Sequence, residues 1–212
     1  PKKITHFTRF NLSDDHIACE VMARKMLTIF CEEKVACYHE QRDFPSLTST
    51  SQLSAALSIG TLSARQCLKE IIKLTQGDLL NTLQYPGELT WLSELIWRDF
   101  YKHILFRHPR LCRHKPYKES TDHLPWKTDE KLLLAWQKGK TGFPLVDAAM
   151  RQLNQTGWMH NRLRMVTAMF FTKTLFLDWR LGEKYFMKNL IDGDFSANNG
   201  GWQWCASTGT DA

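Results

Sequence analysis

Residues 190–204, LIDGDFSANNGGWQW, bring acidic, amide and indole side chains together within fifteen positions. Asp192 and Asp194 supply carboxylates and Asn198 supplies an amide, so the segment can bind hydroxyl and N–H groups of a ligand. Trp202 and the tryptophan two residues later supply flat aromatic surfaces. We expect the Asn-Asn-Gly-Gly run to form a flexible turn beside these tryptophans.

The same segment does not have the pattern of a calcium loop. Asp192, Asp194 and Ser196 fit the first, third and fifth positions of such a loop. Ala197 stands where the loop requires glycine, and Gln203 stands where it requires a bidentate glutamate. We therefore predict no calcium site.

Other short motifs also fail. The run Gly139-Lys140-Thr141 is not a phosphate-binding P-loop, because Leu134 stands where the motif needs its first glycine and the preceding residues look helical. No G-x-G-x-x-G occurs, which excludes a Rossmann dinucleotide site. His108, Cys112 and His114 have no standard zinc spacing, so we predict no metal site.

The helix expected over 91–101 carries a mixed aromatic and charged face. Five residues share this face at helical spacing: Trp91, Glu94, Trp97, Arg98 and Tyr101. The opposite face is apolar and can contact the core: Leu92, Leu95, Ile96 and Phe100. Core packing is the usual role of a tryptophan stripe, but the charges on this face favour a cavity wall that stacks flat rings.

A second helix, expected over 160–176, has a similar face made of Asn161, Arg164, Met165 and Ala168. Arg164 and a carboxylate of the Asp-Gly-Asp segment would make a natural buried ion pair, because a single buried charge is costly. A surface arginine is an equally good interpretation from this helix alone.

Hydroxyl side chains gather at 48–54, TSTSQLS, where another helix should begin. A simple N-cap is the default interpretation. The free N–H groups of a helix start, together with the hydroxyls, would also make a cradle for phosphate.

The 212-residue chain is long enough for one large domain or two small ones, with a formal charge of +6. Residues 107–118, RHPRLCRHKPYK, contain five Arg or Lys and no acid. Such runs are usually solvated loops, but Tyr117 favours a phosphate-facing surface. The sequence has no signal peptide, no long apolar run and no C-x-x-C pair, so we expect a soluble intracellular protein with reduced cysteines.

The periodicity predicts an all-α fold with short Gly- or Pro-bearing connections and a looser segment over 38–51. The predicted helices cover 13–33, 62–74, 87–105, 129–139, 143–157, 160–176 and 182–191. The last residues stop inside what reads as a structured region, so we expect a fragment of a longer protein.

Four long segments, at 38–68, 91–103, 139–165 and 191–212, closely resemble the flavin-binding domain of the photolyase/cryptochrome family. The chain is most similar to the class I cyclobutane pyrimidine dimer photolyases of bacteria. The resemblance implies a helical catalytic domain that binds FAD and DNA over 38–212, truncated at both ends. Residues 1–37 would form a connector and the first helix, and the missing α/β domain leaves no antenna chromophore to assign.

The resemblance assigns residues to a flavin site. The FAD-contacting residues would be Tyr38, Thr50, Ser51, Gln52, Leu53, Ser54, Arg164, Asp192, Gly193, Asp194 and Asn198. The helix start at 50–54 would receive the phosphates, Arg164 would pair with Asp192, and Asn198 would sit beside N5 of the flavin ring. The glycines would let backbone approach the bent cofactor.

The tryptophans divide into two groups. Trp126, Trp179 and Trp202 match the family's electron-transfer chain toward the photoexcited flavin. The catalytic residues around an extruded dimer would be Glu94, Trp97, Asn161, Met165 and Asn198. DNA contacts are implied for Arg42, Glu94, Trp97, Arg98, Tyr101, Asn161, Arg162 and Trp204.

The implied activity is light-driven repair of cyclobutane pyrimidine dimers in double-stranded DNA, in which the reduced anionic flavin lends one electron to the dimer. We expect a monomeric, cytoplasmic bacterial enzyme without a membrane partner. A cryptochrome-type photoreceptor is the main alternative, although Glu94, Trp97 and Met165 together favour repair. Related (6-4) repair enzymes carry histidine where this chain has Asn161. A helical nucleic-acid-binding domain without cofactor is the remaining alternative.

Overall fold

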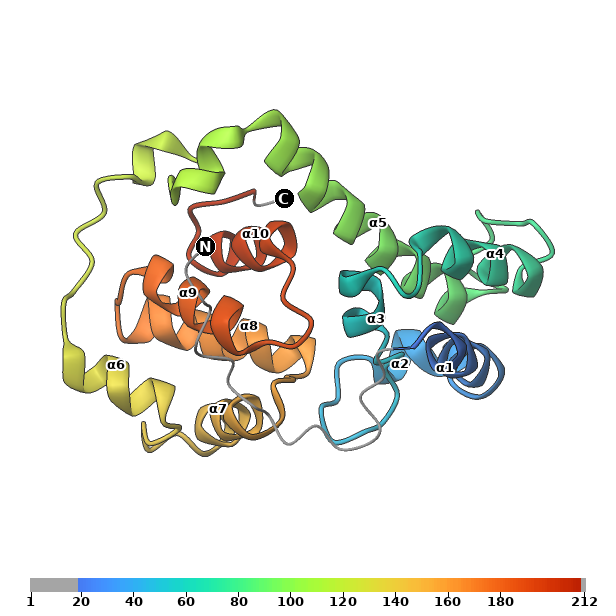
Figure 1. The fold of residues 1–212 in the computed structure, drawn as a ribbon, viewed down its shortest axis with the longest axis horizontal. Helices are drawn as coiled ribbons and strands as arrows, with labels where there is room; N and C mark the ends of the chain where they lie inside the picture. Colours follow the sequence, from blue (N-terminus) through green and yellow to red (C-terminus); the bar gives the residue numbers. More distant parts are fainter. Residues whose placement is uncertain (1–18, 211–212) are drawn as a thin grey trace, which may run out of the picture.

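The computed structural model describes residues 19–210 and contains ten α-helices within them (Figure 1). They are α1 Glu20–Glu33, α2 Tyr38–Gln41, α3 Ser54–Ile59, α4 Ala64–Leu74, α5 Pro86–Arg107, α6 Glu130–Gln137, α7 Pro144–Thr156, α8 Asn161–Met169, α9 Trp179–Asn189 and α10 Phe195–Cys205. No strand occurs in this range, only one isolated bridge between Lys127 and Leu177. The all-α prediction is confirmed, whereas the predicted start of the first helix lies outside the described residues.

Two hydrophobic cores organise these helices. The first lies among α1 to α5 and includes Phe30 and Trp91. The second lies among α6 to α10 and includes Trp136 and Trp202. Helix α5 extends from the α1–α4 group to the group that contains α10, and it packs on both (Figure 1). None of the helices in the described range has the length and apolar character needed to span a bilayer.

Helix α5 has no single buried face, so the face predicted for it is wrong at two positions. Trp91 is 4% exposed and lies in the first core, with its ring centroid 4.9 Å from that of Phe30. Ile96, expected to face the core, is 59% exposed. The reason is that the first half of α5 packs against α2 and α4, while its second half packs against α10.

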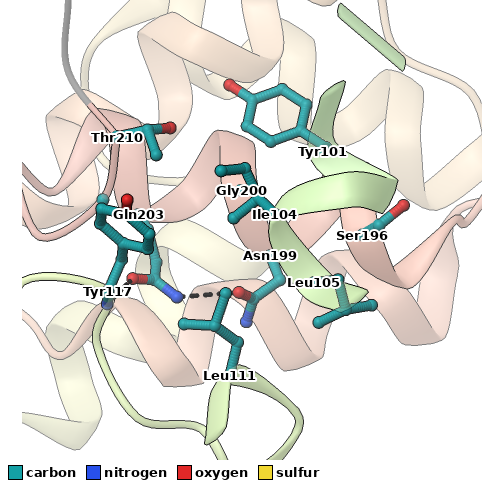
Figure 2. A pocket seen from close by; sticks show the side chains of 11 residues that line it. Tyr101, Ile104, Leu105, Leu111, Tyr117, Ser196, Asn199, Gly200, Gln203 and Thr210 are labelled. Carbon is teal, nitrogen blue, oxygen red and sulfur yellow. Dashed lines mark hydrogen bonds between the residues drawn. The ribbon is translucent and has the colours of Figure 1, made fainter. Parts of the chain in front are cut away.

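The Asn-Asn-Gly-Gly run lies inside α10, so the predicted flexible turn is also wrong. The Asp194 side chain caps this helix by accepting from the Ala197 N–H at 3.0 Å. One turn further, the Gln203 Nε2 donates to Asn199 Oδ1 at 2.8 Å (Figure 2). These contacts hold the run in helical geometry despite its glycines.

Gly200 has a packing role at the contact between α5 and α10. A Cβ there would lie 2.1 Å from Tyr101 Cδ1, so the tyrosine ring rests directly on the helix backbone. The crevice beside this contact has a volume of about 10 Å³ (Figure 2). That space holds about one water molecule, which makes the crevice a packing feature rather than a ligand site.

The loop that contains Gly139-Lys140-Thr141 is closed by Asp147 at the start of α7. The Asp147 carboxylate accepts from the Thr141 N–H at 2.7 Å, from the Thr141 hydroxyl at 2.6 Å and from the Gly142 N–H at 3.0 Å. Burial would raise the pKa of Asp147, but these hydrogen bonds hold the pKa below its usual value. The amides that a P-loop would offer to phosphate are therefore already engaged.

Candidate functional site

A cavity of about 140 Å³ lies between α8, α10 and the segment that joins α9 to α10. It is lined by Asn161, Arg164, Met165, Ala168, Phe186, Leu190, Asp192, Gly193, Asp194, Ala197, Asn198, Gly201, Trp202 and Cys205. The face predicted for α8 is confirmed, because Asn161, Arg164, Met165 and Ala168 all line this cavity. The Asp-Gly-Asp segment forms the wall opposite that face.

The expected ion pair between α8 and this segment is present. Arg164 Nη2 lies 2.7 Å from Asp192 Oδ2, and Arg164 Nε donates to the Met159 carbonyl oxygen at 2.8 Å. The Asp192 side chain is 1% exposed, and its Oδ1 has no hydrogen-bond partner among the described residues. A buried carboxylate oxygen without a partner is costly, so this atom is available to accept from a ligand in the cavity.

Asn198 presents an acceptor to the same cavity. Its Nδ2 donates to the Glu183 backbone carbonyl at 3.0 Å, and a carbonyl oxygen can only accept. This bond fixes the orientation of the amide, so that Asn198 Oδ1 is not the atom that contacts Glu183. A ligand N–H group is the partner that this oxygen can take.

Glu183 on α9 was missed by the sequence analysis. Its side chain is 2% exposed, and burial raises its pKa above the usual value, while His114 Nδ1 lies 3.8 Å away. Asn198 Nδ2 lies 3.5 Å from the Glu183 carboxylate. In the sequence, Glu183 looks like an ordinary polar position in GEKYF, and only its one-turn spacing from Trp179 and Phe186 indicates an inward direction.

The cavity wall fits a large flat ring with polar edges, which is the shape of a flavin. Gly201 lines the cavity, and a Cβ added there would meet nothing within 4 Å, so any side chain would take up ligand space. Ala168 and Ala197 add further small residues, and Trp202 adds an aromatic one. The Asp192 and Asn198 acceptors complete a wall suited to the N–H and hydroxyl groups of FAD.

The three tryptophans assigned to electron transfer all belong to, or pack against, the second hydrophobic core. Trp202 lines the cavity, and a Cβ on Gly182 would lie 2.1 Å from its Cη2, so this indole rests on the backbone of α9. Trp179 begins α9, three residues before Gly182. The Trp126 ring lies 5.2 Å from that of Phe176, just before α9.

Trp126 is the most exposed of the three tryptophans. It is partly buried, whereas Trp179 is 0% exposed and Trp202 is 2% exposed. The indole N–H groups of all three have no acceptor among the described residues. A buried indole usually donates a hydrogen bond, so these three rings differ from the usual arrangement.

The residues expected around a dimer are split between two elements. Asn161 and Met165 line the cavity from α8, while Glu94 and Trp97 on α5 are not part of its wall. Glu94 Oε1 lies 2.6 Å from Arg42 Nη1, so the carboxyl expected to bind a base is paired with an arginine expected to bind phosphate. Trp97 is 49% exposed, as a surface that stacks an outside ring requires.

The remaining residues expected to contact DNA differ in how far their side chains are already engaged by other parts of the protein. Arg98 Nη2 donates to the Leu57 carbonyl oxygen at 2.8 Å, and Tyr101 packs on α10, so both side chains are engaged within the fold. Arg162 pairs with Asp43. Trp204 is partly buried against the second core.

Tyr38 and residues 50–54 are not in the cavity wall. Tyr38 is 8% exposed in the first core, where burial raises the pKa of its hydroxyl to about 12. The predicted phosphate-binding segment leads into α3, with Gln52 at a φ of 53°. The end of α3 approaches the cavity, since the Ser58 hydroxyl donates to the Gly193 carbonyl oxygen at 3.1 Å. A contact of 50–54 with FAD remains a prediction.

Part of the basic run at 107–118 is neutralised within the fold. Arg110 forms an ion pair with Glu119, and Lys115 Nζ lies 2.8 Å from Asp122 Oδ2. The backbone at Tyr117 is tied to α10, because its N–H donates to Gln203 Oε1 at 2.7 Å. The run is therefore less available to phosphates than its composition suggests.

Known proteins share this sequence and fold. The model of the FAD binding domain of DNA photolyase matches residues 91–212. The deoxyribodipyrimidine photo-lyase of Escherichia coli is 51% identical over all of this chain and 44% of that protein. The Salmonella typhimurium protein of the same name is 56% identical over 86% of this chain and 38% of its own length. The chain thus spans less than half the length of these relatives.

Solved structures give the same assignment. A class III photolyase from Agrobacterium tumefaciens has a TM-score of 0.84 and 40% identity, over 92% of this chain and 39% of that one. A Synechocystis cryptochrome also has a TM-score of 0.84, with 32% identity over 97% of this chain and 43% of that one. With the family model covering more than half of its residues, the chain belongs to the FAD-binding domain family of DNA photolyases.

Proposed function

We propose that this chain is the flavin-binding part of a light-driven DNA lyase that repairs cyclobutane pyrimidine dimers. The observation that carries the proposal is the cavity wall itself. It combines the buried Arg164–Asp192 pair, an acceptor amide at Asn198 and an indole at Trp202 around a space without side chains at Gly201. Relatives at 51–56% identity are named deoxyribodipyrimidine photo-lyases, which supports repair as the reaction.

When bound in its reduced anionic form, FAD would supply, under blue light, the electron that splits the cyclobutane ring and would recover it afterwards. The chain's own residues would bind and orient the cofactor. Asp192 Oδ1 would accept from a cofactor N–H or hydroxyl group, and Arg164 holds this carboxylate in place. Asn198 Oδ1 would accept from a ring N–H group, because Glu183 fixes the other end of the amide.

The tryptophan series provides the route by which the cofactor regains electrons from outside. Trp202 lines the cavity, Trp179 is fully buried, and Trp126 is the most exposed of the three. Because their N–H groups have no acceptor among the described residues, we expect the buried indoles to keep their protons when an electron leaves. Reversible passage of charge along the three rings is the expected result.

Damaged double-stranded DNA is the proposed partner. The exposed face of Trp97 would stack on an extruded dimer, whose bases already pair and stack poorly. A DNA phosphate that binds Arg42 would break its ion pair with Glu94, and Glu94 could then bind the dimer. Contact with the DNA backbone would in this way be coupled to recognition of the bases. Asn161 and Met165 would close the cavity on the other side.

A repair assay tests the proposal. The flavin-loaded, reduced protein is mixed with an oligonucleotide carrying one thymine dimer, in blue light and in darkness, and restored thymines are counted. We expect repair in light only, and strong loss in a Glu94→Ala, Trp97→Ala double variant that still binds flavin. Absence of light-dependent repair by the flavin-loaded wild type would overturn the proposal.

A cryptochrome-type photoreceptor is the second candidate, supported by the structural similarity to the Synechocystis cryptochrome. Both candidates share the flavin wall and the tryptophan series. Photoreduction of the flavin without restoration of thymines would favour the photoreceptor, because only repair depends on Glu94 and Trp97.

A further inference from the structure

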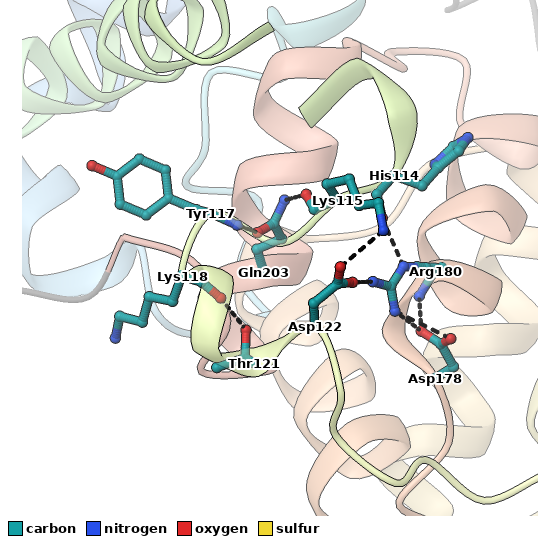
Figure 3. A network of polar contacts seen from close by, with 9 residues as sticks. All are labelled: His114, Lys115, Tyr117, Lys118, Thr121, Asp122, Asp178, Arg180 and Gln203. Carbon is teal, nitrogen blue, oxygen red and sulfur yellow. Dashed lines mark hydrogen bonds and ion pairs between the residues drawn. The ribbon is translucent and has the colours of Figure 1, made fainter. Parts of the chain in front are cut away.

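A cluster of alternating charges is centred on Arg180, which lies against the middle tryptophan of the series. The Arg180 guanidinium carbon lies 5.1 Å from the centroid of the Trp179 ring. Arg180 Nε donates to the His114 carbonyl oxygen at 2.7 Å, and Nη2 donates to Asp122 Oδ1 at 3.0 Å (Figure 3). These bonds, formed on different parts of one planar group, hold the cation in place over the indole.

The cluster is electrically balanced. Arg180 Nη1 also lies 3.2 Å from Asp178 Oδ1, and Lys115 Nζ lies 2.8 Å from Asp122 Oδ2. Two cations and two carboxylates thus form one network that is centred on Arg180 (Figure 3). The Lys115 hydrogen bond lowers the pKa of Asp122, so this carboxylate stays ionised near neutral pH. None of these four side chains is among the residues expected above to contact FAD or DNA.

We propose that this balanced cluster sets how readily Trp179 carries positive charge, with Arg180 as the positioning residue and Asp178 and Asp122 as its counter-charges. The inference rests on the tryptophan route proposed above and deepens it. A cation close to the ring opposes loss of an electron from the indole, and the nearby carboxylates offset that opposition. Trp179 is fully buried, whereas the side chains of Arg180, Asp178 and Asp122 are 20–29% exposed, so their effect on the ring should be largest at low salt.

The electron balance is simple. Trp202 would give one electron to light-excited oxidised flavin, Trp179 would give one electron to Trp202, and Trp126 would give one to Trp179. Each step would restore the previous indole and move the positive charge one ring outward. No bond breaks, and no proton has to leave the buried rings, whose N–H groups have no acceptor among residues 19–210. The charge on the cluster biases only the step that places the positive charge on Trp179.

Two single variants should change that step in opposite directions. Asp178→Asn leaves an excess positive charge, while asparagine keeps the helix cap that Asp178 gives to the Arg180 N–H. Arg180→Gln leaves an excess negative charge. The measurement is flash photolysis of the flavin-loaded, oxidised protein, following the yield and lifetime of the tryptophan radical absorbance at one fixed pH and low salt.

We expect the yield of long-lived tryptophan radical to fall roughly tenfold in Asp178→Asn, because the charge returns from Trp202 before reaching Trp179. In Arg180→Gln we expect a yield at or above that of the wild type. The charge-balanced double variant, Asp178→Asn with Arg180→Gln, should recover most of the wild-type yield. A purely structural role predicts instead that both single variants lower the yield and that the double variant lowers it further, and this outcome overturns the inference.

A Trp179→Phe variant separates the inference from the route on which it rests. If Trp179→Phe loses the long-lived radical, the route stands. If the two charge variants then change the radical yield equally, the proposed role of the cluster is overturned. An unchanged radical yield in Trp179→Phe overturns both. Repair in blue light by protein with pre-reduced flavin does not depend on the route, so it reports on the proposed function separately.

Discussion

Asp43 and Arg162 form an ion pair across 119 residues of sequence, beside the arginine that holds Glu94. Asp43 Oδ1 also lies 3.7 Å from Arg42 Nε, so one carboxylate faces both arginines assigned to DNA phosphates. The hydrogen bond from Arg162 lowers the pKa of Asp43, as a firm pairing requires. In the proposed DNA complex, Asp43 would therefore compete with phosphate for both arginines.

Removing this carboxylate should strengthen DNA binding. In Asp43→Asn, a phosphate no longer has to displace an internal anion from Arg42 and Arg162, so affinity for damaged duplex should rise roughly threefold to tenfold. Binding measured by fluorescence anisotropy over a range of salt concentrations checks this. Asp99→Asn, at an exposed acid on α5, is the matched control for loss of one negative charge. Equal gains in both variants would show that Asp43 has no special place.

The Arg164–Asp192 pair should contribute strongly to stability. Arg164→Met leaves a carboxylate that is 1% exposed without its cation, which should cost about 3 kcal/mol in the free energy of unfolding. Urea unfolding of the flavin-free protein measures this cost. Adding Asp192→Asn should restore part of the loss, because the second change removes the unpaired charge. A double variant as unstable as the sum of both single variants would contradict the buried pairing.

Glu183 should give the protein a distinct pH dependence. Its pKa is raised by burial above the usual value of 4.5, so the folded state binds a proton that the unfolded chain has already lost. Its contribution to stability is therefore fully present below pH 4.5 and is lost as the pH rises through the raised pKa. In Glu183→Gln this loss should disappear.

Unfolding free energies of wild type and Glu183→Gln, measured between pH 4 and 8, test this sign. The difference between the two proteins should shift in favour of the variant as the pH rises. Glu33→Gln, at an exposed position on α1, controls for loss of a carboxyl group as such. A difference that stays constant with pH would show that Glu183 has the same pKa in the folded and the unfolded protein.

Helical periodicity was sufficient to predict the fold class. A buried charge needs a partner, so the residues alone offered a pair between Arg164 and the Asp-Gly-Asp segment beside a surface arginine, and the family resemblance singled out Asp192. The helical conformation of residues 198–201 was not predictable, because the sequence rule that Asn and Gly favour turns ignores tertiary contacts. Here the Asp194 cap and the close approach of Tyr101 to Gly200 stabilise a helix.

The other misses have a common cause, which is packing between distant segments. Trp91 and Ile96 were assigned to the wrong environments because α5 contacts different partners along its length. Glu183 and Arg180 were missed because their partners, Asn198 and Asp122, come from other elements of the chain. The hydrophobic periodicity of one helix does not show which neighbouring element packs against each of its turns.

The position of the flavin on the wall formed by α8 and α10 is the central claim, and Gly201 tests it most directly. A side chain at Gly201 enters the open space of the cavity without meeting other atoms, and leucine or alanine favours a helix more than glycine does. The measurement is the FAD content of purified wild type, Gly201→Ala and Gly201→Leu after saturation with FAD, together with their unfolding temperatures. We predict roughly one FAD per wild-type chain, less in the alanine variant and almost none in the leucine variant, with unfolding of the flavin-free proteins at the same or higher temperature. Full FAD content in Gly201→Leu would contradict the account.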